Sequence, residues 1–141
     1  MKNSLQNAKR WLKQAEYDFG EAEKLLRGND FSYACFFAEQ AAQKSLKAFL
    51  FWRGKRFVAI HSVGALLEEA SLLDPAFGEL IGKGKKLDHY YLASRYPDAL
   101  PEPAIPSESY VKEDAEGAIT IAGEILNRSR EIIGDGGSQG L

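Results

Sequence analysis

A chain of 141 residues, of which 45% are hydrophobic and 27% charged, suffices for one small domain with a core and is too short for two ordinary ones. Its formal net charge of −2 gives no global electrostatic case for nucleic-acid binding, although folding can gather a local basic patch. The single cysteine excludes an internal disulfide, and the most apolar window, 31–52, contains charged side chains that are costly in a bilayer. We therefore expect a soluble, cytoplasmic protein without a membrane-spanning segment.

The first predicted helix covers residues 4–26. Its apolar residues recur at gaps of three and four, which places them in one stripe along a helix. These residues are Leu5, Ala8, Trp11, Leu12, Ala15, Phe19, Ala22, Leu25 and Leu26. Gly28 stands where this helix is expected to end, and Asn29 and Asp30 are suited to cap the next one.

The second predicted helix, 30–52, is apolar nearly all round. Such a helix lies in the middle of a bundle or at a subunit interface. Its large residues offer more apolar surface than one small bundle is expected to bury easily, so the sequence predicts a homodimer. The large residues that carry this prediction are Phe36, Phe37, Phe49, Phe51 and Trp52.

The remaining chain predicts shorter helices, one loop and a last long helix. Ser62 is a suitable N-cap for a short helix, and the next helix, 75–92, carries Gly82 and Gly84 in its middle, where we expect a kink. Four of the five prolines fall in the loop 95–106. A last helix is expected to start at Ser107 or Ser109 and to run to about Ile133, followed by a flexible Gly-rich tail, 134–141.

Together these elements predict an all-α fold. No segment alternates with period two for long enough to argue for a sheet, and most connections are short. Short connections favour antiparallel neighbours, so we expect an antiparallel helical bundle that forms a single domain over residues 4–133.

Several kinds of chemistry find no support in the sequence. The two histidines lie far apart, so no metal site is expected, and the segment 82–85 lacks the setting of a phosphate-binding P-loop. Cys35 lies in the most apolar helix, where an inert core thiol is expected. We therefore expect no metal and no cofactor.

Two groups of polar residues remain as candidates. Gln40, Lys44 and Lys47 share one face of the second helix, which is either a binding face or, as composition favours, the solvated edge of a buried helix. Arg95 and Tyr96 stand at a predicted helix end before a rigid proline. This arrangement suits pairing with a phosphate and stacking on a base, and it equally suits an ion pair that fastens the loop to the bundle.

Taken in order, several segments resemble the HEPN domain family, which is named for nucleotide binding in higher eukaryotes and prokaryotes. The matching segments are 11–19, 33–48, 61–63, 91–99 and the Ala-rich last helix, so the resemblance spans about residues 5–133. It implies an up-and-down bundle of about five helices that commonly forms homodimers. Such proteins are often encoded beside a minimal nucleotidyltransferase, and some of these pairs behave as toxin and antitoxin.

The resemblance also implies a ribonuclease mechanism, from which this sequence departs. Many family members use an Arg followed a few residues later by a His near the last long helix. Here Arg95 matches the Arg, but no His follows it. An Arg-to-His spacing of the family's kind does occur at Arg56 and His61, before the third helix, where we interpret it as chance because Phe57 replaces the expected polar residue.

Three functional hypotheses follow. The first is a non-catalytic or weakly catalytic module that pairs with a nucleotidyltransferase and binds a nucleotide or an RNA phosphate. Its groove would be lined by Lys44, Lys47, His61, Arg95 and Tyr96. The second is a metal-independent ribonuclease that uses Arg95 with His61. The third is a structural dimeric adaptor, in which Arg95 pairs with Asp18 or Asp98; we assign these two aspartates, with Gln40, to structural polar roles.

Overall fold

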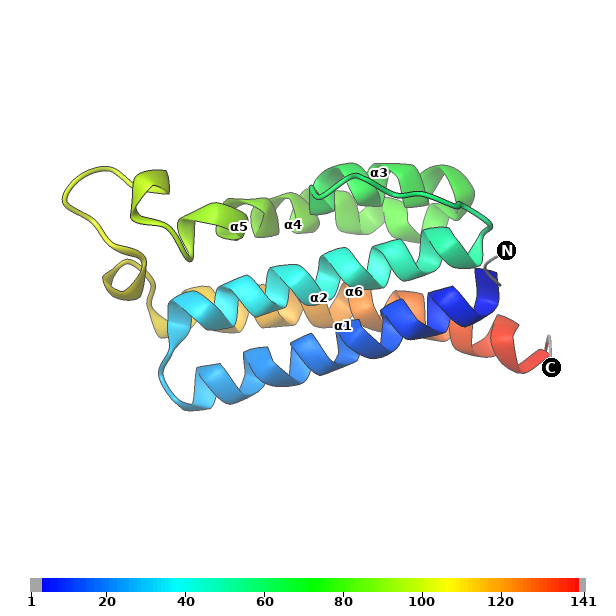
Figure 1. Ribbon diagram of the computed structural model, residues 1–141, viewed down its shortest axis with the longest axis horizontal. Helices are drawn as coiled ribbons and strands as arrows, with labels where there is room; N and C mark the ends of the chain where they lie inside the picture. The colour runs from blue at the N-terminus through cyan, green and yellow to red at the C-terminus, as the bar shows by residue number, and fades with distance from the viewer. Residues whose placement is uncertain (1–3, 140–141) are drawn as a thin grey trace.

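The computed structural model describes the backbone of residues 4–139, and the long elements of this range are helices. Helices α1 (Ser4–Arg27), α2 (Phe31–Trp52) and α6 (Lys112–Gln139) run side by side, with α1 antiparallel to the other two (Figure 1). Helix α3 (Val63–Leu73) and the short turns that follow it lie along the opposite side of α2. Helix α2 is therefore central, and the predicted all-α bundle is confirmed.

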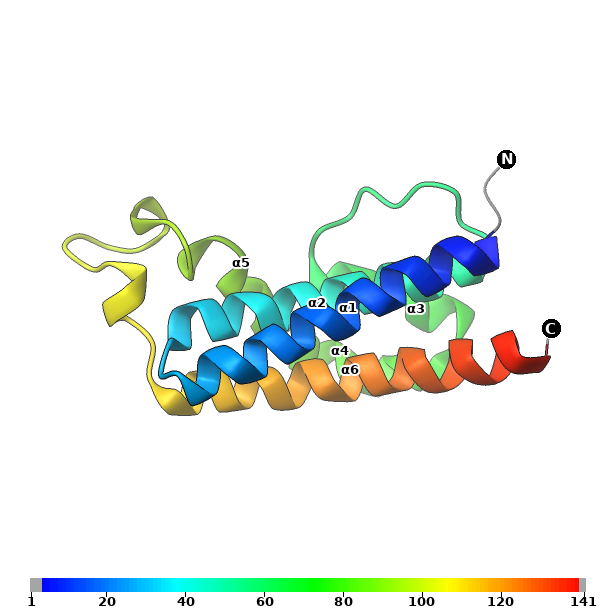
Figure 2. The ribbon, with the colours of Figure 1, turned by 60° about the horizontal axis from the view of Figure 1, so that its bottom comes forward.

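Small residues form the seam between α1 and its neighbours. Ala8, Ala15 and Ala22 recur every seven residues and are completely buried. This spacing keeps one narrow face of α1 turned inward, and alanine lets the neighbouring backbones approach closely. Figure 2 shows α1 crossing in front of α2 and above α6.

The turn between α1 and α2 differs from the sequence prediction in two details. Asn29, with φ of 61°, adopts the left-handed conformation that ends α1, whereas Gly28 does not. Asp30 occupies the N-cap position of α2 but makes no side-chain capping hydrogen bond. Asparagine tolerates positive φ better than other residues that carry a side chain, which explains why the glycine was not needed there.

A single chain buries most of the apolar surface of α2. Phe49 is completely buried, Phe51 is 7% exposed, and Phe36, Phe37 and Trp52 are half-buried. The neighbours on every side of α2 explain this burial, because α1, α6, α3 and the α5 segment all pack on it. The apolar character of α2 therefore does not by itself require a second copy of the chain.

The predicted helix 75–92 is instead a series of four short elements. These are a 3₁₀ turn (Pro75–Leu80), α4 (Ile81–Gly84), a second 3₁₀ turn (Lys85–His89) and α5 (Tyr90–Ala93). Gly84 shows why this segment lies so near α3, since a Cβ on it would come within 2.1 Å of the Leu67 side chain. Close packing on α3 therefore shapes the segment in addition to the loosening that the two glycines predicted.

The last helix begins later and ends later than the sequence predicted. It starts at Lys112 rather than after Ser107 or Ser109, and the Val111 backbone N–H donates to the Asp114 carboxylate, 2.9 Å away. A carboxylate in the first turn satisfies one of the unpaired N–H groups there, so no serine cap is needed. The helix continues past Ile133 to Gln139, and the rest of the predicted tail, 140–141, lies outside the described residues.

Candidate functional site

Arg95, in the turn after α5, is held by aromatic rings and one carbonyl. Its Nε and Nη2 atoms donate to the Tyr91 carbonyl oxygen at 3.0 and 2.7 Å. Its guanidinium carbon lies 4.2 Å from the ring centroid of Phe36, 5.1 Å from that of Tyr91 and 4.9 Å from that of Tyr96. Three ring contacts fix the plane of the guanidinium, because a cation is attracted to the face of an aromatic ring.

The guanidinium of Arg95 retains hydrogen-bonding capacity. Among the ion pairs of the described residues, Arg95 takes part in none, and its Nη1 atom makes no hydrogen bond there. The side chain is half-buried, so a ligand can reach it from solvent. A planar cation with open N–H groups matches the oxygens of a phosphate or carboxylate.

His61 lies at the start of α3 and joins α2 to the Arg95 region. Its Nδ1 atom is 3.3 Å from Lys47 Nζ and 3.3 Å from Gln43 Oε1. Nδ1 accepts from the lysine in one tautomer and donates to the glutamine in the other, so one of the two contacts is a hydrogen bond at a time. The His61 ring is nearly parallel to that of Tyr91, with centroids 6.2 Å apart.

Tyr91 therefore brings together two residues whose proximity the sequence left open. His61 lies against its ring, and Arg95 contacts both its ring and its backbone carbonyl. A small pocket of ≈ 210 Å³ lies beside it, lined by His61, Ser62, Asp88 and Tyr91. We call the set Lys47, His61, Tyr91, Arg95 and Tyr96 the His61–Arg95 surface.

Lys47 occupies the inner edge of this surface. The residue is only 5% exposed, and its Nζ lies 5.6 Å from the centroid of the Trp11 ring. Burial lowers the pKa of Lys47, and the negative charge of Glu39 partly opposes that effect. The solvated-edge interpretation of this helix face therefore does not hold for Lys47.

Glu39 is a buried carboxyl that the sequence analysis did not single out. It is completely buried in α2 and accepts hydrogen bonds from Gln40 at 2.7 Å and Gln43 at 2.8 Å. Burial raises its pKa from 4.5 to about 7, and the charge of Asp88 adds to that effect while Arg95 opposes it. A glutamate followed by glutamines one and four residues later in a mostly apolar helix is the sequence signal that could have identified it.

Asp88 is the second polar residue that the sequence analysis missed. Its carboxylate accepts hydrogen bonds from the backbone N–H groups of Val63 at 2.6 Å and Gly64 at 3.1 Å, and from the Ser62 hydroxyl at 2.8 Å. Ser62 also caps α3 as predicted, since its oxygen accepts from the Ala65 N–H. Asp88 thus fixes the helix start next to His61, a tertiary contact that no local pattern reveals.

Lys44 does not lie in the same group as the other predicted binding residues. It forms an ion pair with Asp18 at 2.6 Å, and Gln14 also donates to this aspartate at 3.1 Å. The ion pair predicted between Arg95 and Asp18 is therefore wrong. Asp98 is exposed and takes part in none of the ion pairs of the described chain, whereas Gln40 donates a hydrogen bond to Glu39.

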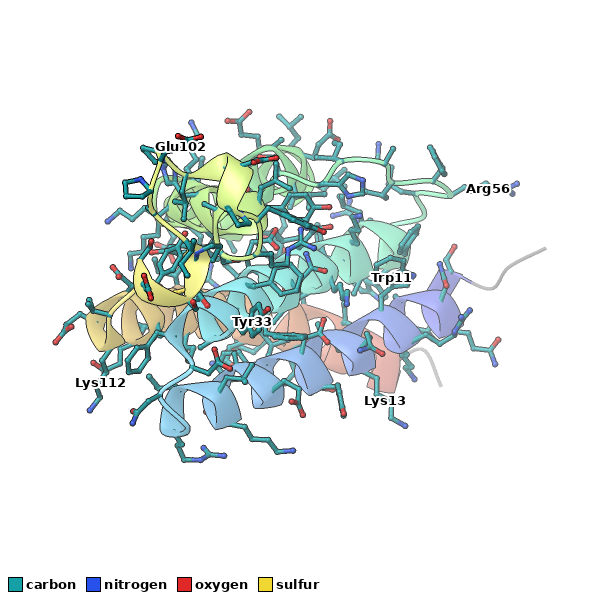
Figure 3. All side chains as sticks on the ribbon, turned by 60° about the vertical axis from the view of Figure 1, so that its left-hand side comes forward. Trp11, Lys13, Tyr33, Arg56, Glu102 and Lys112 are labelled. Atoms are coloured by element: carbon teal, nitrogen blue, oxygen red, sulfur yellow. The ribbon has the colours of Figure 1, made fainter. Side chains whose placement is uncertain are left out.

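The remaining residues that the sequence analysis discussed, Arg56 and Cys35, lie outside the His61–Arg95 surface. Arg56 is exposed on the connection before α3, at the edge of the molecule (Figure 3). Cys35 is buried, and burial raises the pKa of its thiol to about 12, so it is no nucleophile at neutral pH. Within residues 4–139, no three His, Cys, Asp or Glu side chains converge as metal ligands, and no helix is long and apolar enough to cross a membrane.

Known proteins resemble this chain over nearly its full length. The family model described as HEPN domain matches residues 8–132. A protein of Methanocaldococcus jannaschii named "Putative toxin MJ1304" is 30% identical over an alignment of 137 residues, which covers 92% of this chain and 90% of the relative.

Two solved structures show the same similarity in three dimensions. TT1696 from Thermus thermophilus has a TM-score of 0.79 and 36% identity, and the match covers 88% of this chain and 96% of that one. ST0689, described as an archaeal HEPN homologue, has a TM-score of 0.74 and 35% identity, with 94% and 99% of the two chains covered.

Proposed function

Because the chain belongs to the HEPN domain family, we propose that it is a HEPN-type module that binds the phosphate of a nucleotide or RNA at the His61–Arg95 surface. One observation carries this proposal. The Arg95 guanidinium is fixed among three aromatic rings, yet it forms no ion pair with a carboxylate of the described residues. A rigid, half-buried arginine with open N–H groups suits bidentate contact with phosphate oxygens.

The other members of the surface supply complementary contacts. Tyr96 is 51% exposed next to Arg95, so a base can stack on its ring. The exposed His61 adds a ring nitrogen on the α2 side, and the buried Lys47 adds a positive charge beside it. Asp88 lines the neighbouring pocket, but its carboxylate accepts from two backbone N–H groups at the N-terminus of α3, which partly offset the repulsion that an incoming phosphate meets.

We propose further that the module works in a toxin–antitoxin-like pair. The name of the M. jannaschii relative supports the toxin-like assignment. A minimal nucleotidyltransferase is the partner that the family resemblance implies, and a homodimer is the assembly that it implies. Light scattering at micromolar concentration tests the dimer, and co-purification with a co-expressed nucleotidyltransferase tests the partner.

A second candidate function is a metal-independent ribonuclease, favoured by the shared contact of His61 and Arg95 with Tyr91. In such a reaction His61 takes the proton of a ribose 2′-OH, whose oxygen then attacks the adjacent phosphorus. Arg95 stabilises the negative charge of the phosphorane, and the 5′-oxygen leaves with a proton from water. The products are a 2′,3′-cyclic phosphate and a 5′-hydroxyl.

One set of variants distinguishes RNA cleavage from RNA binding. Titration of labelled single-stranded RNA measures binding, and gel analysis of the same samples with EDTA present measures cleavage. Arg95→Ala should abolish both, whereas His61→Ala should abolish cleavage and weaken binding only modestly. Arg53→Ala is the matched control, because Arg53 is an exposed arginine that also donates to a backbone carbonyl, that of Leu73. If wild-type protein shows no saturable binding to nucleotides or RNA, the proposed function is wrong.

A further inference from the structure

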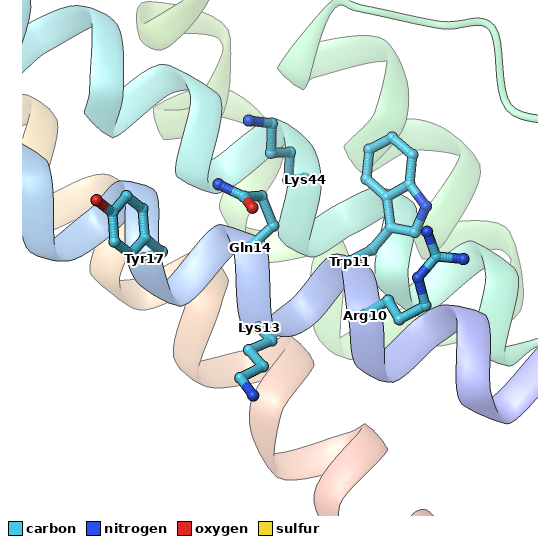
Figure 4. A pocket seen from close by; sticks show the side chains of 6 residues that line it. All are labelled: Arg10, Trp11, Lys13, Gln14, Tyr17 and Lys44. Carbon is cyan, nitrogen blue, oxygen red and sulfur yellow. The ribbon is translucent and has the colours of Figure 1, made fainter.

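A groove on α1 lies outside the residues assigned to phosphate binding. It has a volume of ≈ 580 Å³ and is lined by Arg10, Trp11, Lys13, Gln14, Tyr17 and Lys44 (Figure 4). All but Lys44 come from α1, because positions 10, 13, 14 and 17 share one face of a helix. The groove therefore combines three cations with two aromatic rings on adjacent helices.

Two of the three cations of this groove lack a counter-charge among the described residues. Arg10 and Lys13 are exposed, and neither forms an ion pair or hydrogen bond with the part of the chain that the structure describes. The third cation, Lys44, is paired with Asp18, and Glu16 pairs with Arg130. A local positive potential follows even though the whole chain is slightly acidic.

The two rings of the groove differ in how open they are to stacking. Tyr17 is 65% exposed, whereas Trp11 is half-buried with its ring 5.5 Å from that of Phe51. Lys47 Nζ also lies over the Trp11 ring, so Tyr17 is the more accessible ring for stacking. Exposed rings beside unpaired cations are the combination by which proteins hold single-stranded nucleic acid, since rings stack on bases and cations contact the backbone.

The buried Lys47 lies between the groove and the other members of the His61–Arg95 surface. Lys47 Nζ lies 5.6 Å from the Trp11 ring centroid and 3.3 Å from His61 Nδ1. Helices α1 and α5 both pack on α2, so the groove on α1 and the turn that carries Arg95 are separated by two helix-to-helix spacings, roughly 16–20 Å. A single nucleotide does not bridge that distance.

We infer that the α1 groove and the His61–Arg95 surface together bind one single-stranded RNA segment of several nucleotides. The inference rests on the proposed function and names its ligand class, an oligonucleotide rather than a mononucleotide. An acidic peptide would match the cations but would leave Trp11 and Tyr17 without flat partners. A second copy of this chain would have to bring carboxylates to Arg10 and Lys13, and the experiment below detects that case.

The test compares two ligands and two charge-matched double variants. The ligands are adenosine 5′-monophosphate and a fluorescein-labelled oligoadenylate of about 12 nucleotides. R10A/K13A removes the free cations of the groove. The control, R27A/K112A, removes one exposed arginine and one exposed lysine outside the groove, and Lys112 lies far from Trp11 (Figure 3).

We expect R10A/K13A to weaken oligoadenylate binding by about tenfold and to reduce the slope of log affinity against log salt by about 1.4, because two phosphate contacts are lost. Its affinity for the mononucleotide should match that of the control. Tyr17→Ala should weaken oligoadenylate binding without changing the salt slope, since stacking releases no counterions.

The inference is overturned if R10A/K13A and R27A/K112A bind the oligoadenylate equally, while Arg95→Ala abolishes binding. In that case the proposed function stands and the groove has no part in it. It is also overturned if R10A/K13A lowers the mass measured by light scattering, since the groove would then be an interface between copies. If neither ligand binds wild-type protein, the proposed function itself is wrong.

Discussion

The guanidinium carbon of Arg95 lies 4.2 Å from the centroid of the Phe36 ring, so the turn after α5 rests directly on the central helix. The same arginine donates to the Tyr91 carbonyl, which makes it a link between two parts of the chain. Replacing Arg95 is therefore expected to change the stability of the fold as well as the binding of a ligand.

Arg95→Ala is expected to lower the free energy of unfolding by about 1–2 kcal/mol, because a partly desolvated cation–π contact and a backbone hydrogen bond are lost. Arg95→Lys should recover little of the loss, since an ammonium has neither the plane nor the fork of a guanidinium. Urea unfolding of both variants, with Arg53→Ala as the control, measures this. An unchanged midpoint would contradict the structural role, and lost stability without lost RNA affinity would support the adaptor hypothesis.

The buried carboxyl of Glu39 predicts that stability falls as pH rises. Its pKa is raised from 4.5 to about 7, so the folded protein holds this proton more tightly than the unfolded chain does. The contribution of Glu39 to the free energy of unfolding is fully present below the unfolded pKa of 4.5 and is lost as pH rises through about 7. Its total is on the order of 3 kcal/mol. Glu39→Gln should flatten this part of the profile, because glutamine does not titrate. Gln40, at the half-buried edge, can turn its amide to match the new side chain.

Urea midpoints of wild type and Glu39→Gln between about pH 5 and pH 8 test this assignment. The Glu39→Gln variant should gain stability relative to wild type as pH rises. Glu23→Gln, which changes an exposed carboxylate of α1 in the same way, is the control. A constant difference between wild type and Glu39→Gln across the range would contradict the prediction.

Two glycines of α4 should respond oppositely to alanine. A Cβ on Gly84 would meet Leu67 Cδ1 at 2.1 Å and Val63 Cγ1 at 3.2 Å, whereas a Cβ on Gly82 meets nothing within 4 Å. We expect Gly84→Ala to destabilise by about 1–3 kcal/mol through overpacking. Gly82→Ala should be neutral or stabilise by about 0.5–1 kcal/mol, because alanine is the better helix former. Thermal unfolding compares the pair, and equal effects would mean that α3 and α4 do not pack as described.

Ser129 and Ser45 form a second matched pair. Both are completely buried, but Ser45 Oγ donates to the Ala42 carbonyl at 2.9 Å, whereas Ser129 Oγ has no described partner. Ser129→Ala should therefore stabilise by about 1 kcal/mol, since a buried unsatisfied hydroxyl is removed. Ser45→Ala should be neutral or destabilising by a similar amount. A destabilised Ser129→Ala variant would show that this hydroxyl does have a partner.

The sequence predicts the helices well where their pattern is local. The stripe of α1, the apolar α2 and the Ser62 cap are all confirmed. The segment 75–92 was predicted less well, because its path depends on how closely Gly84 packs against Leu67. Spacing along one element does not reveal contact with another.

The candidate site was likewise predicted from the sequence only in part. Arg95 and Tyr96 stood out from composition and position, and in the structure the Arg95 guanidinium carbon lies 4.9 Å from the Tyr96 ring centroid. Glu39 and Asp88 were missed, because their significance comes from burial and from tertiary hydrogen bonds. Lys44 was grouped with Lys47 by helical spacing, but its pairing with Asp18 turns it toward the α1 groove.

Fluorescence anisotropy of labelled single-stranded RNA, with wild type, Arg95→Ala and Arg53→Ala at one fixed salt concentration, tests the central claim most directly. Phosphate binding at the His61–Arg95 surface predicts saturable binding that Arg53→Ala leaves unchanged and that Arg95→Ala weakens by at least about tenfold, the loss of one charge-assisted contact. Equal affinities for folded Arg95→Ala and wild type would contradict it.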